Sequence, residues 1–353
     1  MKAIKFIILI TVFQTTMVKS QLPTYNPDLE WMPGKDSSWS GNPLKDGRYV
    51  NHEFPMNHSF SLVWKWKKQK NPFEEAKKKD TFQLPVTDNW TDFLDSTQEG
   101  IFWLGHATFL IRLGGKTFIT DPVFNKATVV KRESPFPIEV EKLKGIDYVM
   151  ISHDHRDHLD KTSLRKLKKL NPNIQFFTGL NMDRIVRKFL KGAEGQTAGW
   201  YQKYKTNDFE LYFLPTRHWC KRSIGDTNKR LWGAFILKIG DRMIYFGGDS
   251  GYGSHYADLK KWFPEINLAI LGIGAYEPEW FMESNHTSPA KAFQAFKDME
   301  ADYLVPMHYG TFDLSDEPLG NPLEVIKGIK NKQAETAILL PRLGDNILKM
   351  MEN

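Results

Sequence analysis

The sequence "ISHDHRDHLD", residues 151–160, concentrates potential metal ligands in one short segment. The chain has ten histidines, and three of them, His153, His155 and His158, fall within six positions beside Asp157. Neutral imidazole nitrogens and carboxylate oxygens are ligands that zinc and similar divalent ions bind in proteins. Alternate residues of an extended segment point to the same side, so His153, His155 and Asp157 can converge. Four ligands at this density favour two ions rather than one.

Three later residues extend this donor set. His218, Asp249 and His308 each follow an apolar stretch that is predicted to form a strand. Strand ends meet at one edge of an α/β sheet, and binding sites form there. A carboxylate can also bridge two cations. We therefore expect these three side chains to join the histidine loop in a metal centre.

The part of the chain after residue 100 alternates strand and helix patterns. Strands are predicted at 101–113 and 116–124 (joined at Gly114–Gly115), 147–152, 174–179, 209–219, 267–276 and 301–310, with a hairpin over 233–250 turning at Gly240–Asp241 and a closing strand or hairpin over 337–350. Helices are predicted at 163–170, 181–192, 288–299 and 322–330. Hairpins mixed with strand–helix units indicate a layered α/β domain with mixed sheets.

The N-terminus has the pattern of an export signal. Lys2 and Lys5 precede an apolar run over 6–13, and small residues follow near position 20. The run is far shorter than the ~20 residues that span a bilayer. We predict a signal peptide over 1–20, an N-terminal arm over 21–98 and a hydrolase domain over 99–353, in a periplasmic or extracellular protein. An uncleaved anchor and a buried N-terminal segment are the alternatives for the first segment.

The arm is rich in tryptophan and lysine, and the whole chain carries a net charge of +6. Trp64 and Trp66 lie beside Lys65, Lys67 and Lys68, a composition that is typical of a membrane interface. Packing of the tryptophans on the main domain is the other interpretation. A single cysteine, Cys220, excludes a disulfide within the chain.

The order HxHxDH, His, Asp, His resembles the signature of the metallo-β-lactamase superfamily of binuclear hydrolases. Longer motifs resemble the N-acylphosphatidylethanolamine-hydrolysing phospholipase D family: "WLGHATFLI", "TDPVF", "HWCKR", "NKRLWG", "GDSGY", "IGAYEPEWFM" and "HYGTF". The likeness covers residues 98–350, and "DGRYVN" in the arm shares it. It implies an α/β, four-layer αβ/βα sandwich of two mixed sheets flanked by helices.

The resemblance also implies roles for individual residues. It assigns one zinc ion to His153, His155 and His218, a second to Asp157, His158 and His308, and Asp249 to both; other divalent metals suit the same donors. Asp157, Asp249 and His286 are implied as catalytic, with His286 near the substrate phosphate. Asp121 is expected to orient a ligand histidine, and His106 to brace the site. Arg156 departs from the aromatic residue of the mammalian enzymes, so acyl-chain preference transfers less well than metal chemistry.

The implied activity is that of a binuclear zinc phosphodiesterase of phospholipase D type. Its substrates would be N-acylphosphatidylethanolamine-like phospholipids, and its products phosphatidate and N-acylethanolamine. The resemblance also implies a homodimer, and the composition of the arm adds peripheral membrane contact as an expectation. A lactonase or other carbon–oxygen hydrolase is the alternative enzyme class, and a metal-dependent membrane-binding protein without turnover is the non-enzymatic one. A nuclease is disfavoured and no nucleic acid partner is expected, because we find no basic and aromatic platform for single strands.

Overall fold

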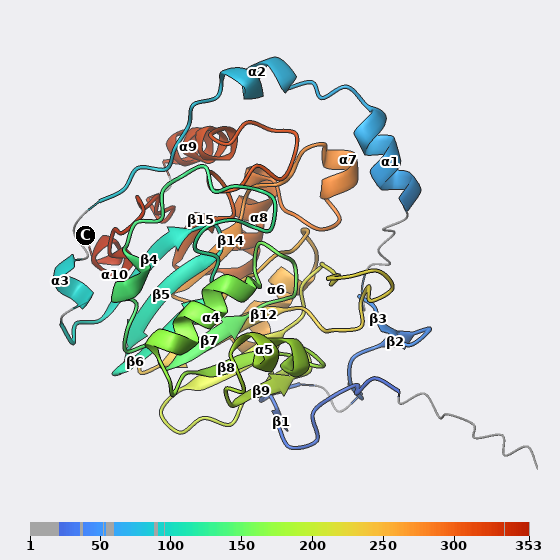
Figure 1. The fold of residues 1–353 in the computed structure, drawn as a ribbon, viewed down its shortest axis with the longest axis vertical. Helices are drawn as coiled ribbons and strands as arrows, with labels where there is room; N and C mark the ends of the chain where they lie inside the picture. The colour runs from blue at the N-terminus through green and yellow to red at the C-terminus, as the bar shows by residue number, and fades with distance from the viewer. Residues whose placement is uncertain are drawn as a thin grey trace, which may run out of the picture.

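The computed structural model describes residues 21–35, 38–51, 53, 60–87, 91–94, 96–334 and 336–352. The predicted export signal over 1–20 lies outside these residues and stays a prediction. Two sheets form the centre of the molecule, and helices cover their outer faces (Figure 1). No helix within the described ranges is long and apolar enough to cross a bilayer.

The first sheet has six strands and takes them in chain order. They are β4 (Gly100–Gly105), β5 (Thr108–Leu113), β6 (Lys116–Thr120), β7 (Tyr148–Ile151), β8 (Gln175–Gly179) and β9 (Gly195–Ala198). The β4–β5 and β5–β6 pairs are antiparallel, whereas β6 to β9 run parallel. The carboxyl ends of β6 and β7 therefore meet at one edge, where Asp121 and the histidine loop begin.

The second sheet has seven strands and is mixed as well. In sheet order they are β1 (Glu30–Trp31), β10 (Gln202–Lys203), β11 (Glu210–Leu214), β12 (Ala234–Ile239), β13 (Arg242–Phe246), β14 (Leu268–Gly272) and β15 (Tyr303–Met307). Strands β13, β14 and β15 are parallel, and the other pairs are antiparallel. Asp249 follows β13 and His308 follows β15, so both lie at the same edge of this sheet.

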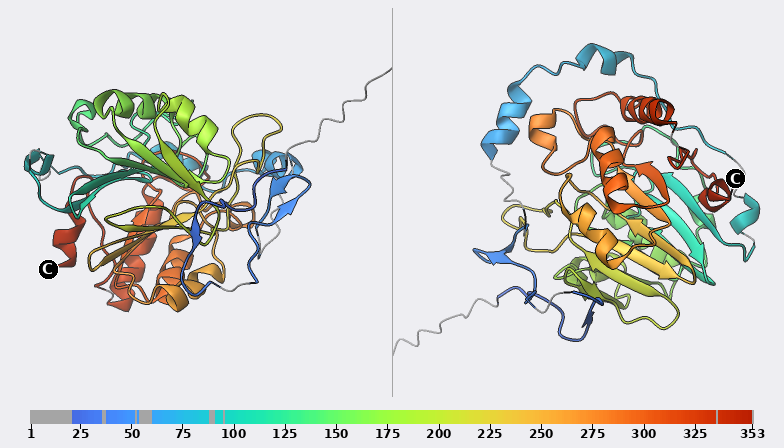
Figure 2. Two further views of the ribbon diagram at one scale, coloured as in Figure 1. Left: turned by 90° about the horizontal axis from the view of Figure 1, so that it is seen from below. Right: turned by 180° about the vertical axis from the view of Figure 1, so that it is seen from behind.

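The layers stack as helix, sheet, sheet and helix (Figure 2, left). Helices α4 (Lys161–Leu170) and α5 (Asp183–Phe189) cover the six-stranded sheet, and α6 (His255–Trp262), α8 (Pro289–Met299) and α9 (Asn321–Gln333) cover the seven-stranded one. Ser288 caps α8 by accepting a hydrogen bond from Lys291 N, and Pro289 opens the helix. Trp103, Trp200 and Trp232 are fully buried in the core. The sandwich with two mixed sheets confirms the predicted fold class.

Two sequence-based assignments are wrong. The stretch 101–113 forms two strands, because Gly105 (φ 102°) and His106 (φ 53°) turn the chain back on itself. The stretch 337–350 is neither a strand nor a hairpin: it makes isolated bridges at Ile338, Leu343 and Asn346, and then enters α10 (Ile347–Met351). Pro341 cannot donate to a ladder, which explains why a continuous strand does not form. The short strands β1, β9 and β10 have no clear pattern in the sequence.

The N-terminal arm lies along the surface of the sandwich. It adds β1 to the seven-stranded sheet, forms the ribbon of β2 (Leu44–Lys45) and β3 (Arg48–Tyr49), and continues through α1 (Phe60–Lys68), α2 (Glu74–Lys79) and α3 (Thr91–Leu94). In Figure 1, α1 lies beside α7 (Glu279–Met282) at the margin of the domain. Trp66 stacks on Phe281 with ring centroids 5.1 Å apart, whereas Trp64 remains 54% exposed. One tryptophan therefore packs on the domain and the other does not.

Candidate metal centre

Two groups of side chains that can bind a cation lie next to each other at this edge. The first group contains His153, His155, His218 and Asp249, and the second contains His106, Asp157, His158 and His308. Within each group the candidate ligand atoms all lie within 4.8 Å of one another. The structure thus brings together all seven residues that the sequence suggested as ligands, and it adds His106.

In the first group, three imidazoles point their nitrogens at one position. His155 Nδ1 lies 3.0 Å from His153 Nε2 and 3.1 Å from His218 Nε2. Two nitrogens that share a tetrahedral zinc ion at its usual bond length are about 3.3 Å apart. Asp249 Oδ2 lies 3.8 Å from His153 Nε2 and 3.7 Å from His218 Nε2. These spacings suit a common ion.

Asp249 also faces the second group. Its Oδ2 lies 3.2 Å from His158 Nε2, and its Oδ1 lies 3.2 Å from His308 Nε2. Asp157 Oδ2 lies 3.4 Å from His158 Nε2 and 3.5 Å from His308 Nε2. The Asp249 carboxylate is therefore the side chain that the two groups have in common.

Hydrogen bonds on the far side of the rings fix their tautomers. His218 Nδ1 faces the carbonyl oxygen of Asn285 at 3.1 Å, and a carbonyl only accepts, so Nδ1 carries the proton. His158 Nδ1 donates to Asp121 Oδ2 at 2.8 Å. When either ring is neutral, its Nε2 is then a lone pair directed into the centre, as a metal ligand requires.

Asp121 controls a third ring through Ser152. The Ser152 hydroxyl donates to Asp121 Oδ2, so its oxygen accepts from His153 Nδ1 at 2.9 Å. Asp121 also accepts from the Ser152 backbone N–H at 2.8 Å. The expected contact between Asp121 and a ligand histidine is present, and it extends to a second one. Ser152 could not be singled out from the sequence, because a single serine before a histidine is common.

The buried carboxylates of the centre require compensating positive charge. Although burial opposes ionisation, His158 and His308 hold the pKa of Asp249 well below its usual value. Likewise, despite burial, the Asp249 and Asp157 carboxylates raise the pKa of His158, and the same two carboxylates raise that of His308 to about 9. Burial lowers the pKa of His153 and His218, which keeps them neutral. Protons or metal cations can supply the charge that the carboxylates need.

Unpartnered atoms at the centre support a cation. His158 Nε2, His308 Nε2 and Asp249 Oδ1 are buried and have no hydrogen-bond partner among the described residues. Buried polar atoms without partners are costly, and a metal ion would satisfy all three. The donor set of imidazole and carboxylate matches zinc-type sites. The residues therefore fit the metals that the sequence suggested.

Several other side chains hold the ligand loop in place. Arg222 Nη1 donates to the backbone oxygens of Asp154, His155 and Leu159 at 3.0, 3.4 and 2.6 Å. Arg230 forms an ion pair with the fully buried Asp154. His106, which the sequence suggested as a brace, contacts Asp157 Oδ2 through Nε2 at 2.9 Å. The sequence reasoning missed Arg222 and Arg230, although both lie in the quoted motifs "HWCKR" and "NKRLWG".

A cavity of about 370 Å³ opens over the two groups. Its lining combines apolar side chains with cations, and includes Arg156, Trp219, Lys221, Phe281, Met282 and Leu314 together with His155, Asp157, Asp249 and His286. His286 Nδ1 lies 3.8 Å from Asp249 Oδ2, and burial lowers the pKa of this imidazole to about 4. His286 thus stands at the cavity wall next to the carboxylate shared by both groups.

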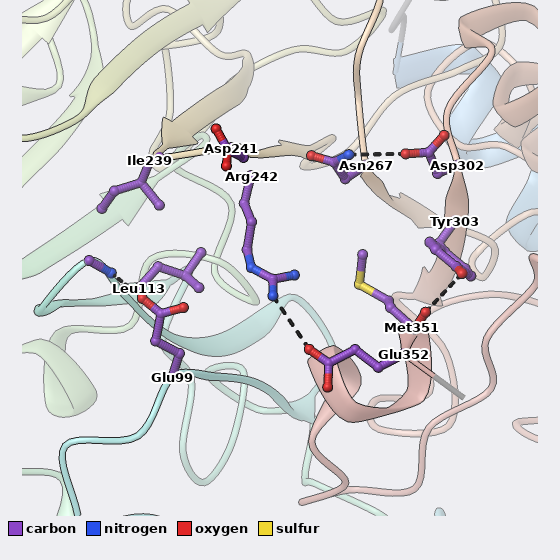
Figure 3. Close-up of a pocket in the computed structure, with 12 residues that line it drawn as sticks. Glu99, Leu113, Ile239, Asp241, Arg242, Asn267, Asp302, Tyr303, Met351 and Glu352 are labelled. Atoms are coloured by element: carbon purple, nitrogen blue, oxygen red, sulfur yellow. Dashed lines mark hydrogen bonds and ion pairs between the residues drawn. The ribbon is translucent and has the colours of Figure 1, made fainter.

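A second cavity of about 420 Å³ lies at the opposite edge, where β14 and β15 begin (Figure 3). Its polar side chains pair with one another: Arg242 with Glu352 at 3.5 Å, and Asn267 with Asp302 at 3.0 Å. None of the candidate metal ligands lines it. Its size exceeds that of the first cavity, but it lacks the side chains for the chemistry described above.

A family model described as a beta-lactamase superfamily domain matches residues 116–309. The chain belongs to the metallo-β-lactamase superfamily. This superfamily member is 31% identical over 309 residues to an N-acyl-phosphatidylethanolamine-hydrolyzing phospholipase D 1 of Caenorhabditis elegans, with 83% of each chain covered. A mitochondrial protein of the same description from Saccharomyces cerevisiae is 30% identical over 245 residues, which cover 64% of this chain and 50% of that one.

Two solved structures share the fold. A metallo hydrolase of Ignicoccus hospitalis matches with a TM-score of 0.53 at 19% identity, covering 70% of this chain and 96% of the other. A possible metal-dependent hydrolase of Veillonella parvula matches with a TM-score of 0.58 at 16% identity, covering 70% and 98%. The superfamily member is a metal-dependent hydrolase with candidate metal-binding histidine and aspartate clusters.

Proposed function

We propose that this hydrolase is a binuclear zinc phosphodiesterase of phospholipase D type that acts on N-acylphosphatidylethanolamine-like phospholipids. The observation that carries the proposal is the position of Asp249, whose carboxylate lies 3.2 Å from His158 and His308 and 3.7 Å from His218. One zinc ion would be held by His153, His155 and His218, and the other by Asp157, His158 and His308, with Asp249 shared. When bound, such ions polarise phosphate oxygens and lower the pKa of a water molecule.

The cavity suits a phospholipid headgroup region. Arg156 and Lys221 can bind phosphate oxygens, while Trp219, Phe281 and Leu314 provide apolar surface for the adjoining chains. The relatives described as N-acyl-phosphatidylethanolamine-hydrolyzing enzymes support this substrate class. In the reaction, water adds to phosphorus and the bond from phosphorus to the ethanolamine oxygen breaks. The products are phosphatidate and N-acylethanolamine.

His286 is the side chain that we assign to the substrate phosphate. It lines the cavity 3.8 Å from Asp249, and its lowered pKa keeps it neutral near pH 7. A neutral imidazole still offers one N–H group, which can donate to a phosphate oxygen as negative charge builds up. His106 and Asp121 would orient Asp157 and His158 without touching substrate.

The test is phosphatidate release from N-acylphosphatidylethanolamine vesicles by purified protein. Asp249→Asn at matched zinc content is the control for the shared carboxylate, and a lactone panel is assayed in parallel. Release by the wild type, with loss in the variant, supports the proposal. Lactone hydrolysis without phosphatidate release would favour a carbon–oxygen hydrolase. Zinc binding without turnover of either substrate would support the metal centre but contradict the proposed phospholipase activity.

A further inference from the structure

The motif "DGRYVN", residues 46–51, belongs to the N-terminal arm, outside the residues 116–309 that match the superfamily domain. Asp46 and Gly47 have φ values of 51° and 67°, and they form the two-residue loop between β2 and β3. Positive φ at both positions is what the type I′ turn of a tight hairpin requires. The Asp-Gly pair thus accounts for the ribbon, but not for the residues that follow it.

The next residues of the motif contact one segment between β11 and β12, residues 218–228. The Arg48 guanidinium donates to the backbone oxygen of Thr227. The backbone N–H of Tyr49 donates to Asn228 O at 2.8 Å, and Tyr49 is fully buried. Figure 1 shows the β2–β3 ribbon beside this segment.

The last residue of the motif contacts a candidate metal ligand. Asn51 Nδ2 donates to the backbone oxygen of His218 at 3.0 Å. The His218 ring is held at a second point, where Nδ1 donates to Asn285 O at 3.1 Å. Nε2 of the same ring lies 3.1 Å from His155 Nδ1 in the first ligand group. One contact at the backbone and one at the ring thus fix the direction in which Nε2 points.

Segment 218–228 is closed by its own hydrogen bonds. The Asn228 N–H donates to Cys220 O at 2.8 Å, and the Asn228 side chain accepts from the Cys220 N–H at 3.0 Å. Arg222, in the same segment, donates to three backbone oxygens of the ligand loop. A shift of this segment would therefore move His218 and Arg222 together.

A second part of the arm supports the segment that carries Asn285. In α1, the Trp66 ring stacks on Phe281 of α7, and its Nε1 donates to Asp316 Oδ2 at 3.0 Å. Asn285 lies in the turn that follows α7. The arm therefore contacts both segments that fix His218.

We propose that Asn51 of the arm is a positioning residue for the metal centre: its amide fixes the backbone of His218, so that the imidazole presents Nε2 to the ion of the first group. Residues that orient a ligand without touching the metal influence metal affinity. The inference rests on the part of the proposed function that gives the first group a metal ion. A contact that only docked the arm would change stability when removed, but not the geometry around a bound metal.

The experiment compares Asn51→Leu with the matched control Asn26→Leu. Asn26 is also a half-buried asparagine of the arm, and its Nδ2 donates to a backbone oxygen, that of Thr197, at 2.7 Å. Thr197 lies in β9 and takes no part in the metal centre. Asn51→Asp is a second test variant, because it keeps the size of the side chain and cannot donate when ionised. Chemical unfolding measures the stability of each protein.

The readouts are zinc titration and the visible absorption spectrum of the cobalt(II)-loaded protein. We expect both Asn51 variants to bind zinc at one of two sites about tenfold more weakly and to show an altered cobalt spectrum, which depends on ligand geometry. Asn26→Leu should lose similar stability and keep the zinc affinity and spectrum of the wild type. Wild-type affinity and spectrum in the Asn51 variants would overturn the inference, as would equal changes in Asn26→Leu. Failure of both Asn51 variants to fold would also overturn it, since the contact would then be structural.

Failure of the proposed function is recognised separately. A wild type that binds zinc but releases no phosphatidate from N-acylphosphatidylethanolamine would remove the phospholipase activity, whereas the effect of Asn51 on the metal can still stand. A wild type that binds no metal would overturn both.

Discussion

Asp121 and His158, which belong to different loops, are joined by a 2.8 Å hydrogen bond between Oδ2 and Nδ1, and neither side chain is exposed. A carboxylate can only accept, so this contact places the imidazole proton on Nδ1 and leaves Nε2 free for a metal. The same carboxylate acts on His153 through Ser152. The buried Asp121 thus orients one histidine, and sets its tautomer, in each of the two groups.

Replacing this acceptor should weaken metal binding without removing a ligand. In Asp121→Asn, an amide N–H in place of Oδ2 donates to His158 Nδ1 and drives the proton to Nε2. We expect zinc affinity of the second group to fall about 10–100-fold. Zinc titration by calorimetry measures it. Ser152→Ala keeps the Asp121–His158 contact and removes only the contact with His153, so it should weaken the first group and spare the second. Zinc retention like wild type in Asp121→Asn would contradict this role.

Arg222 should stabilise the ligand loop through its backbone. Arg222→Met leaves the carbonyls of Asp154, His155 and Leu159 without their guanidinium donor. Buried acceptors without partners cost about 1–3 kcal/mol, so the free energy of unfolding should fall by that order. Chemical denaturation measures the loss, and zinc content should fall with it. Arg165→Met, on the exposed face of α4, should change neither; equal effects of both substitutions would argue against a specific role.

Gly248 should be required next to Asp249 for two reasons that can be separated. Its φ is +55°, and an added Cβ would lie 2.8 Å from Ser152 Cβ. Gly240 has φ +56° but nothing within 4 Å of an added Cβ. Gly240→Ala therefore measures the backbone strain alone, about 1–2 kcal/mol.

Gly248→Ala should cost a further ~1–3 kcal/mol because of crowding. It should also lower zinc content, since Ser152 and Asp249 would both shift. Thermal unfolding and metal analysis of the two variants give the comparison. Equal losses of stability with full zinc content in both would show that Ser152 tolerates the added methyl group.

The metal-free protein should lose stability in alkali. Although burial opposes protonation, Asp249 and Asp157 raise the pKa of His308 from 6.5 to about 9. A raised folded-state pKa stabilises the fold below pH 6.5, and this contribution is lost as the pH rises through about 9. Unfolding of chelator-treated protein across this window should show a falling midpoint. His308→Gln should flatten the profile, and an unchanged slope in that variant would assign the effect to other groups.

Zinc affinity should rise with pH over the same range, from pH 6.5 to about 9, in which the stability of the metal-free protein falls. Zinc has to displace the protons that the carboxylates hold on His158 and His308, so its apparent affinity should rise with pH. Calorimetric titration at two pH values, in buffers of different ionisation enthalpy, would count the protons released. Release of none would contradict the charge balance described for the centre.

The sequence by itself identified the candidate metal ligands and the strand ends at which they lie. The density of candidate ligands in 151–160 is a local feature. Strand periodicity places His218, Asp249 and His308 at the ends of apolar stretches. Both features can therefore be recognised in the sequence without knowledge of the tertiary contacts. The same reasoning predicted the helix that begins near Ser288 and the hairpin at Gly240–Asp241. It failed at 101–113, where a left-handed turn at His106 interrupts an apolar pattern that reads as continuous.

Only the tertiary structure decided how the ligands are held. The tautomers depend on Asp121 and on the Asn285 carbonyl, which lie 37 and 67 residues from the rings that they orient. Arg222 reaches loop carbonyls 63 to 68 residues away. Likewise, Trp64 and Trp66 have the same lysine-rich surroundings in the sequence, and only the contact of Trp66 with Phe281 and Asp316 separates them. Ligand identity is a property of local chemistry, whereas orientation comes from contacts between segments that the fold alone brings together.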